Sequence, residues 1–250
     1  MTMDQFNRQA YADRAAGLDI DAGLRAYMLA VYRYMGMGLA LTGGIAYLVY
    51  MMSITETASG QLALTGLGDM LFNSPLKWVI MLAPLGVVFY LSARINRMSA
   101  AAAQGSFWLY AGLNGVSFAT IFMVFTGMSI AKVFLITACM FGAMSLWGYT
   151  TKRDLTGMGS FLFMGLIGIV IASVVNIFLA SDMMSFIISI VGVLVFTGLT
   201  AYDTQAIKEQ YSVSDSGELA QKKSIMGALR LYLDFINLVI MMLQLFGNRE

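Results

Sequence analysis

Seven long apolar stretches, separated by short polar connections, dominate this chain of 250 residues. A helix needs about 20 mostly apolar residues to cross the hydrocarbon core of a bilayer. Because backbone groups cannot stay unpaired in lipid, we expect these stretches to be helices and not open strands. The sequence therefore predicts an all-α membrane protein with seven transmembrane helices. The predicted spans are residues 27–52, 74–93, 107–125, 130–149, 161–180, 183–207 and 225–246.

The overall composition indicates the same class. Hydrophobic residues make up 59% of the chain and charged residues 12%, whereas soluble domains carry roughly 45–50% and about 25%. With this few charged residues, the polar surface is too small to cover a soluble globule. The excess of apolar side chains is therefore expected to face a lipid bilayer. The net charge is +1 and no long basic run occurs. We therefore expect no nucleic-acid partner.

The chain has no histidine and a single cysteine, Cys139. Without histidine, Ser-His-Asp and Cys-His catalysis and histidine-ligated zinc are excluded. One cysteine cannot form a disulfide framework within the chain. Proton chemistry near neutral pH is therefore expected of carboxylates or of the lone thiol, and no tightly bound cofactor is predicted.

The charged residues predict the domain limits and the orientation in the membrane. Residues 1–26 are polar and lack the basic start, apolar stretch and cleavage site of a signal peptide. We predict a cytoplasmic tail over residues 1–26 and one seven-helix domain over residues 27–250. Cytoplasmic segments are enriched in lysine and arginine. The basic residues before the first span and after the second, fourth and sixth spans are Arg8, Arg14, Arg25, Arg94, Arg97, Lys152, Arg153, Lys208, Lys222 and Lys223, against Lys77, Lys132 and Arg249 in the alternate segments. This bias predicts a cytoplasmic N-terminus and, after seven spans, an outer C-terminus.

Two aspartates within the last two spans are the strongest functional signal. Asp203 lies near the cytoplasmic end of the sixth span, and Asp234 lies well inside the seventh. An aspartate in the middle of a span costs about 2.5–3.5 kcal/mol on insertion scales, so such residues usually face the bundle interior or a wet cavity.

The seventh span carries a polar stripe on one face. Its members recur at spacings of three and four residues, which places them on one side of a helix. They are Gly227, Arg230, Asp234, Asn237, Met241 and Gln244. Weaker polar faces on the third and fifth spans, Asn114 with Ser117 and Ser173 with Asn176, are candidates to line the same interior, although helix-packing hydrogen bonds explain them better.

A purely structural role of the aspartates has equal standing from spacing alone. Arg230 and Asp234 are separated by four residues and can form an ion pair within one helix. Asp203 can cap a helix end or pair with Lys208 or Arg94.

If the two aspartates face each other, their chemistry becomes specific. Two carboxylates about 4 Å apart repel by roughly 4 kcal/mol at an effective dielectric constant near 20. Such a pair is expected to share a proton near neutral pH and to titrate as a unit. When ionised, it is also a hard oxygen site for a calcium ion, with Asn237 as a further oxygen donor and water completing the shell.

Four stretches carry a resemblance to a known family: residues 83–89, 141–155, 198–205 with Tyr202-Asp203, and 228–238 with Leu-Tyr-Leu-Asp-Phe-Ile-Asn. In these stretches the chain resembles the Bax inhibitor-1 (transmembrane BAX inhibitor motif) family, and in particular its proteobacterial inner-membrane members. The similarity runs over nearly the whole chain, from about residue 24 to residue 247.

The resemblance implies a seven-helix bundle in which six helices surround the last one. It further implies a passive, pH-sensitive calcium leak governed by the pair Asp203 and Asp234, in a monomer of the bacterial inner membrane. In some members an arginine at the cytoplasmic end of the second helix binds the pair and closes the path. Arg94 is the best match for that arginine and Arg97 the next, while Arg230 is a further candidate counter-ion.

Three other functions remain open. A non-enzymatic regulator that binds a membrane protease or another membrane partner is the main alternative. An intramembrane aspartyl protease also needs two aspartates, but the protease-like string Gly66-Leu67-Gly68-Asp69 lies between spans and precedes Tyr202-Asp203. We therefore expect no enzyme. A secondary transporter is weaker, because matching broken helices are lacking.

Overall fold

A computed structural model describes residues 3–56 and 62–248 of the chain, with side chains described from residue 22 onward except at residues 56, 62 and 96. Seven of its helices are long and apolar enough to cross a membrane, as predicted. In chain order the elements are α1 (Met3–Ser53), β1 (Ile54–Glu56), β2 (Leu62–Leu64), α2 (Gly66–Phe72), α3 (Leu76–Arg94), the 3₁₀ helix η1 (Ile95–Arg97), α4 (Ala100–Phe118), α5 (Ile121–Val124), α6 (Gly127–Thr150), α7 (Thr156–Leu179), α8 (Asp182–Glu209) and α9 (Gly217–Phe246).

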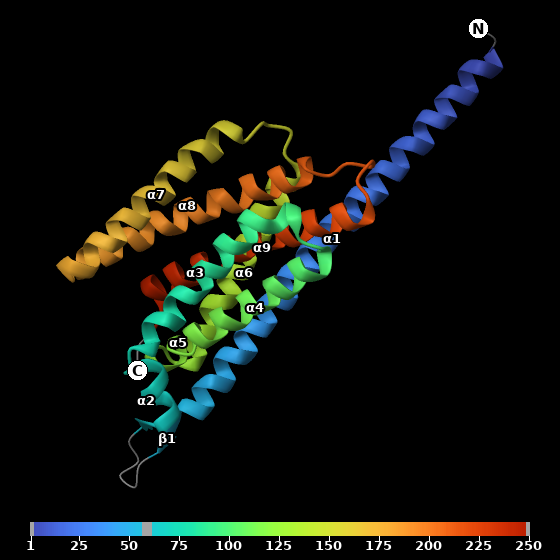
Figure 1. Ribbon diagram of the computed structural model, residues 1–250. Helices are drawn as coiled ribbons and strands as arrows, with labels where there is room; N and C mark the ends of the chain where they lie inside the picture. The colour runs from blue at the N-terminus through green and yellow to red at the C-terminus, as the bar shows by residue number, and fades with distance from the viewer. Residues whose placement is uncertain (1–2, 57–61, 249–250) are drawn as a thin grey trace.

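The polar N-terminal segment is the largest difference from the predicted boundaries. From Met3 onward the predicted tail is helical and continuous with the first span, so α1 extends well past the bundle (Figure 1). The candidate span within α1 covers Ala22–Ser53 and includes the predicted span 27–52. Residues 1–2 lie outside the described part.

Between α1 and α3 the structure contains elements that the sequence analysis did not predict. β1 and β2 pair as an antiparallel hairpin, with Ile54 opposite Leu64, and α2 follows. Strands of three residues lie below the length at which alternation of apolar and polar residues is recognisable.

Serine and threonine side chains set where several helices begin. Each accepts a hydrogen bond from the backbone N–H three residues ahead, which satisfies one of the unpaired donors of the first turn. These N-caps are Ser99 for α4, Thr126 for α6, Ser181 for α8 and Ser216 for α9. Ser181 follows Ala180, whose left-handed backbone (φ 47°) ends α7. Two residues, Ala180 and Ser181, thus connect α7 to α8 in a tight helical hairpin.

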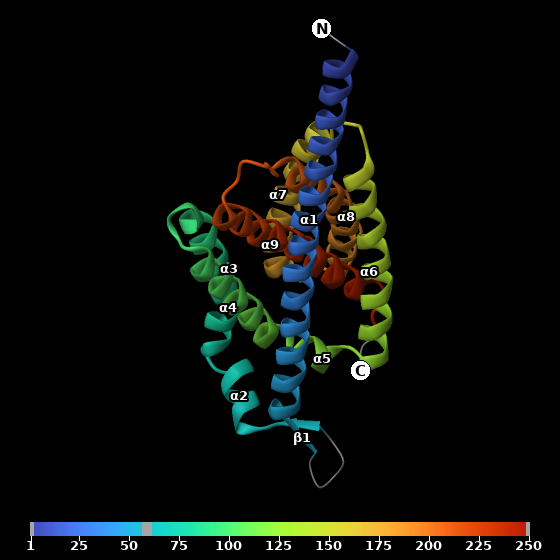
Figure 2. The same cartoon turned by 90° about the vertical axis from the view of Figure 1, so that its right-hand side faces the viewer.

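The last helix is the centre of the bundle, as predicted. The most apolar window of α9 is 61% buried, whereas those of the other spans are 11–39% buried. Its main neighbours are α1, α4, α6 and α8 (Figure 2). The ring is less complete than the resemblance implies, because α3 packs mainly on α4 and α7 on α8. The two spans with the least burial thus form an outer layer.

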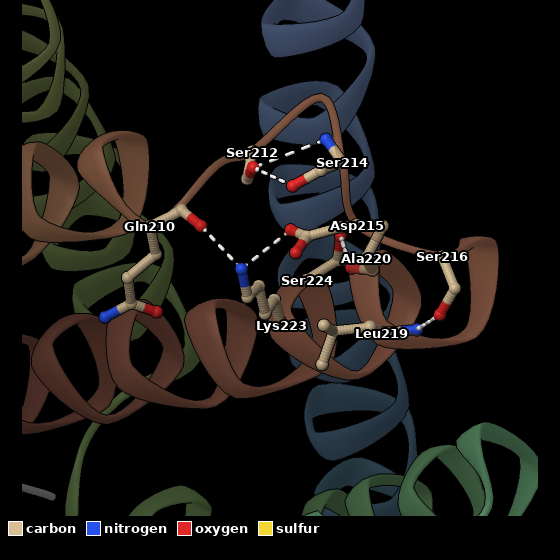
Figure 3. A network of polar contacts seen from close by, with 9 residues as sticks. All are labelled: Gln210, Ser212, Ser214, Asp215, Ser216, Leu219, Ala220, Lys223 and Ser224. Atoms are coloured by element: carbon tan, nitrogen blue, oxygen red, sulfur yellow. Dashed lines mark hydrogen bonds and ion pairs between the residues drawn. The ribbon is translucent and has the colours of Figure 1, made fainter.

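The connection between α8 and α9 is held by a polar network (Figure 3). The Nζ of Lys223 on α9 lies 2.7 Å from Oδ2 of Asp215 and donates to the carbonyl of Gln210 at 2.9 Å. Ser212 and Ser214 share a further hydrogen bond of 2.8 Å within the loop. These contacts join the two helices that carry the aspartates.

Candidate functional site

Asp203 faces α9 because its neighbours on α8 pack against other helices. The backbone of Ala201 lies directly against Gly148 of α6, where a Cβ atom would collide with the Ala201 carbonyl. The ring of Tyr202 covers Gly159 of α7 in the same way. Successive side chains point about 100° apart around a helix. Because Ala201 and Tyr202 face α6 and α7, the side chain of Asp203 points toward the seam between α8 and α9.

The residues after Asp203 bind α6 and its following loop. Thr204 Oγ1 lies 2.9 Å from Ser145 Oγ, which lies 2.6 Å from Tyr32 Oη, so one hydrogen-bond chain joins α8, α6 and α1. Gln205 Oε1 accepts a hydrogen bond of 2.8 Å from the backbone N–H of Leu155. These contacts fix the rotation of α8 about its axis, and with it the direction of Asp203.

Asp234 is oriented on α9 by two aromatic neighbours in the same motif. Tyr232 is fully buried, and its Oη lies 2.7 Å from Oγ1 of Thr42 on α1. Phe235 packs edge-on against Phe141 of α6, with ring centroids 5.4 Å apart. Because these side chains occupy the faces toward α1 and α6, the Asp234 side chain projects toward α8.

The two carboxyl groups meet across the seam. Asp203 and Asp234 are close enough to share a hydrogen bond when one of them carries a proton. Asp234 is buried, and its Oδ2 has no hydrogen-bond partner among the described residues. Buried polar atoms without a partner are rare and require an explanation such as a bound proton, ion or water.

A cavity of about 590 Å³ opens beside the pair, between α7, α8 and α9. Besides the aspartates, the ionisable groups on its wall are Arg230 and Tyr202. The complete lining is Gly159, Ser160, Phe163, Leu166, Phe196, Leu199, Tyr202, Asp203, Arg230, Leu233, Asp234 and Asn237. The carboxylates therefore lie on the wall of a space large enough to hold water molecules.

Of the three candidate arginines, Arg230 lies nearest to the aspartate pair. Arg230 acts electrostatically on both carboxyl groups and lines the cavity, whereas Arg94 at the end of α3 and Arg97 in η1 do not line it. The hypothesis that Arg94 or Arg97 binds the pair stays a prediction about another conformation.

The simple ion pairs considered from spacing are not formed. Within the described residues, the ion pairs closer than 4 Å are Lys222–Glu218 and Lys223–Asp215, so Arg230 lies farther than that from Asp234. Lys208, the other suggested partner of Asp203, instead donates to the carbonyl of Tyr149 at 2.8 Å. Arg94 does not pair with Asp203 either, so none of the three ion pairs of the structural interpretation is present among the described residues.

Of the asparagines that were candidates for the polar lining, Asn237 lies at the cavity and Asn114 does not. Asn237 lines the cavity, and its amide donates to the Leu233 carbonyl at 2.8 Å, which leaves the amide oxygen as an acceptor. Asn114 is buried on α4, donates to the carbonyl of Tyr110 at 3.1 Å and does not line this cavity. Helix packing explains Asn114, as the alternative interpretation allowed.

The oxygen atoms of Asp203, Asp234 and Asn237 can bind a hard cation only if water molecules supply further ligands. The two carboxylates and the Asn237 amide supply oxygen ligands, which calcium prefers, but fewer than the six to eight that it takes. The described residues hold no cluster of three or more histidine, cysteine or acidic side chains able to bind a metal ion. Such a site fits an ion in passage better than a permanently held one.

The protease-like string lies far from this arrangement in the chain and outside the spans. Gly66–Phe72 form the short helix α2, in which Asp69 accepts a hydrogen bond of 2.8 Å from Asn73. The chain Tyr32–Ser145–Thr204, by contrast, was missed from the sequence. The sequence contained one sign of this hydrogen-bond chain, the polar residue Ser145 within an apolar span, but the spacing of residues does not identify the partners of that serine.

Comparison with known proteins gives matches over nearly the full length. Residues 24–250 match the family model described as inhibitor of apoptosis-promoting Bax1. The inner membrane protein YbhL of Escherichia coli (strain K12) is 47% identical over 233 residues, which is 92% of this chain and 94% of that one. The uncharacterized protein RP147 of Rickettsia prowazekii is 47% identical over 230 residues, 92% of each chain. An uncharacterized protein of Caulobacter vibrioides is 40% identical over 255 residues, 99% of this chain and all of the other.

Proposed function

This chain belongs to the Bax inhibitor-1 family of membrane proteins, and from that premise we propose that it is a pH-sensitive calcium leak channel gated by Asp203 and Asp234. The proposal includes a location in the inner membrane, by analogy with the Escherichia coli inner membrane protein YbhL. In this proposal the protein is not an enzyme: the carboxylates bind protons and a passing cation, and no bond is broken. Calcium is the cargo and not a cofactor.

The observation that carries the proposal is a buried acidic pair on the wall of a cavity, with one carboxylate oxygen that no described protein group satisfies. A structural pair is normally matched by a counter-charge or by hydrogen bonds. Here the arginine is farther than 4 Å. The unsatisfied oxygen is instead suited to a ligand that comes and goes.

The pair supports gating by competition between protons and calcium. When both carboxylates are ionised, they attract a divalent cation, and Asn237 and water complete its shell. A proton shared between them removes that charge and replaces the cation with a hydrogen bond. Because a few oxygen ligands bind calcium weakly, the ion can leave as well as enter, which conduction requires.

The test is calcium entry into dye-loaded liposomes that contain the purified protein, measured between about pH 6 and pH 8 around the range in which a shared proton is expected. We expect the flux to fall as the pH is lowered, since protons displace calcium. The double variant Asp203→Asn, Asp234→Asn should lose this pH dependence. A flux no greater than that of empty liposomes at every pH would exclude the channel and favour a regulator that binds a membrane partner.

Asp154 provides a matched control outside the spans. Hydrogen bonds from the Thr156 side chain and backbone N–H hold the pKa of the Asp154 carboxyl below its usual range. It therefore remains ionised across the tested pH range, because the ordinary pKa of an aspartate is already about 3.9. Asp154→Asn should leave the pH dependence unchanged. If this variant abolished it as well, a general charge effect and not the pair would be responsible.

A further inference from the structure

A second polar cavity lies on the seam between α8 and α9, toward the opposite end of the helices. It has a volume of about 380 Å³ and is lined by Asp182, Ser185, Phe186, Ser189 and Gln244. Its α8 residues are at the start of that helix, and Gln244 is close to the end of α9. Ser189 Oγ donates to Oε1 of Gln244 at 2.6 Å, which ties the two helices together at this point.

Both cavities lie along the same two helical stripes. Spacings of three and four residues connect the members of each stripe, so each keeps to one face of its helix. On α8 the stripe is Asp203, Leu199, Phe196, Gly192, Ser189, Ser185 and Asp182; on α9 it is Arg230, Asp234, Asn237, Met241 and Gln244. The stripes are polar at both ends and apolar between them.

Within the apolar part, the two stripes are in close contact at Met241 and Gly192. Met241 follows Asn237 by four residues and precedes Gln244 by three, so it stands between the two cavities on α9. It lies on the bare backbone of the buried residue Gly192, where a Cβ atom would be 2.9 Å from both Cγ and Sδ of Met241. The absent side chain at Gly192 is what lets the methionine fill the seam.

We propose that Met241, seated on Gly192, is the constriction that separates the aspartate cavity from the second polar cavity. This inference rests on the proposed function, because it takes the seam as the path of the cation. A thioether offers no ligand to a hard cation, and apolar constrictions exclude ions by excluding water. Methionine is unbranched and has three rotatable bonds, so it can leave the seam without a movement of the helices.

The test measures access to the seam from each side of the membrane with a membrane-impermeant thiol reagent. The background is Cys139→Ser, since Cys139 is exposed. Ser185→Cys reports the second cavity and identifies the side from which it is reached. Asn237→Cys reports the aspartate cavity. We expect Asn237→Cys to react only from the opposite side, and to gain reactivity from the Ser185 side, several-fold, when Met241→Ala is added.

Met242→Ala is the matched control. It removes the same side chain from the adjacent position of α9, but Met242 is buried in the core on another face. It should leave the labelling of Asn237→Cys unchanged while a comparable cavity is created. Every variant must elute as a single species and unfold in one cooperative transition above the temperature of the labelling, because both truncations are expected to lower the thermal midpoint. Labelling of Asn237→Cys from the Ser185 side with Met241 intact would overturn the proposal, and so would unchanged labelling after Met241→Ala.

Calcium flux through Met241→Ala separates this inference from the proposed function. If both hold, the flux rises several-fold at constant pH. If labelling changes as expected but neither wild type nor variant conducts calcium, the constriction stands and the calcium channel fails. If wild type conducts but labelling and flux do not respond to Met241→Ala, the channel stands and the constriction is elsewhere.

Discussion

At the level of single residues, the direction of Asp203 depends on glycines that allow α8 to approach its neighbours. In membrane bundles small residues bring helix backbones together, because close packing replaces the hydrophobic driving force. Gly148 is such a residue, since the carbonyl group of Ala201 occupies the space where its Cβ would lie. A change of 100° in the rotation of α8 would turn Asp203 away from Asp234.

Gly148→Ala should therefore destabilise the protein, by about 1–3 kcal/mol as is typical of overpacking, and weaken the pH response. The collision is with backbone, so no side-chain rotation can relieve it. Gly142→Ala is the control on the same helix, because a Cβ at Gly142 meets nothing within 4 Å. That change should be neutral or stabilising by up to about 1 kcal/mol. Thermal unfolding in detergent compares the two; equal midpoints would show that α6 and α8 tolerate separation.

At the level of secondary-structure elements, the connection of α8 to α9 keeps the two aspartate-bearing helices in register. Asp215 is 9% exposed and Lys223 27% exposed, so their ion pair is more shielded than an ordinary surface pair. The same lysine binds the Gln210 carbonyl immediately after α8 (Figure 3). One side chain thus links the end of α8, the loop and the first turns of α9.

Asp215→Asn should loosen this connection, since it removes the charge that holds Lys223. We expect faster hydrogen exchange of the backbone over residues 210–216 and a loss of stability on the order of 1 kcal/mol. Ser212→Ala removes only the two hydrogen bonds to Ser214 within the loop, and should change the exchange of α9 little. Equal exchange in Asp215→Asn and wild type would mean that helix packing alone sets the register.

At the level of the whole molecule, the positively charged connections gather at one end. The Nζ of Lys222 donates to the carbonyl of Met98, after η1, at 3.0 Å, and Lys208 binds the Tyr149 carbonyl at the end of α6. In Figure 2 the α3–α4, α6–α7 and α8–α9 connections lie toward the end at which the chain starts. The basic residues that predicted orientation along the chain are thus close together in space, where they reinforce one another.

This arrangement predicts that the shared end is cytoplasmic, since lysine and arginine are retained on that side. A green fluorescent protein fused to the C-terminus should stay dark, because it would be exported, while alkaline phosphatase at the same position should be active. A fluorescent fusion at the N-terminus is the control. A fluorescent C-terminal fusion would contradict the odd number of spans if the N-terminal fusion is also fluorescent, and the orientation if the N-terminal fusion is dark.

The seven spans, the central polar stripe of α9 and the two aspartates were determined by the sequence alone, because length, hydropathy and the period of 3.6 residues act within each helix. Periodicity does not say which neighbour a polar face meets. Tertiary packing decided that Asp203 meets Asp234, that Arg230 and not Arg94 lies beside them, and that Asn114 points elsewhere. It also decided that Met241 lies on Gly192. Each of these depends on the rotation of one helix relative to another, which close contacts between residues distant in sequence establish.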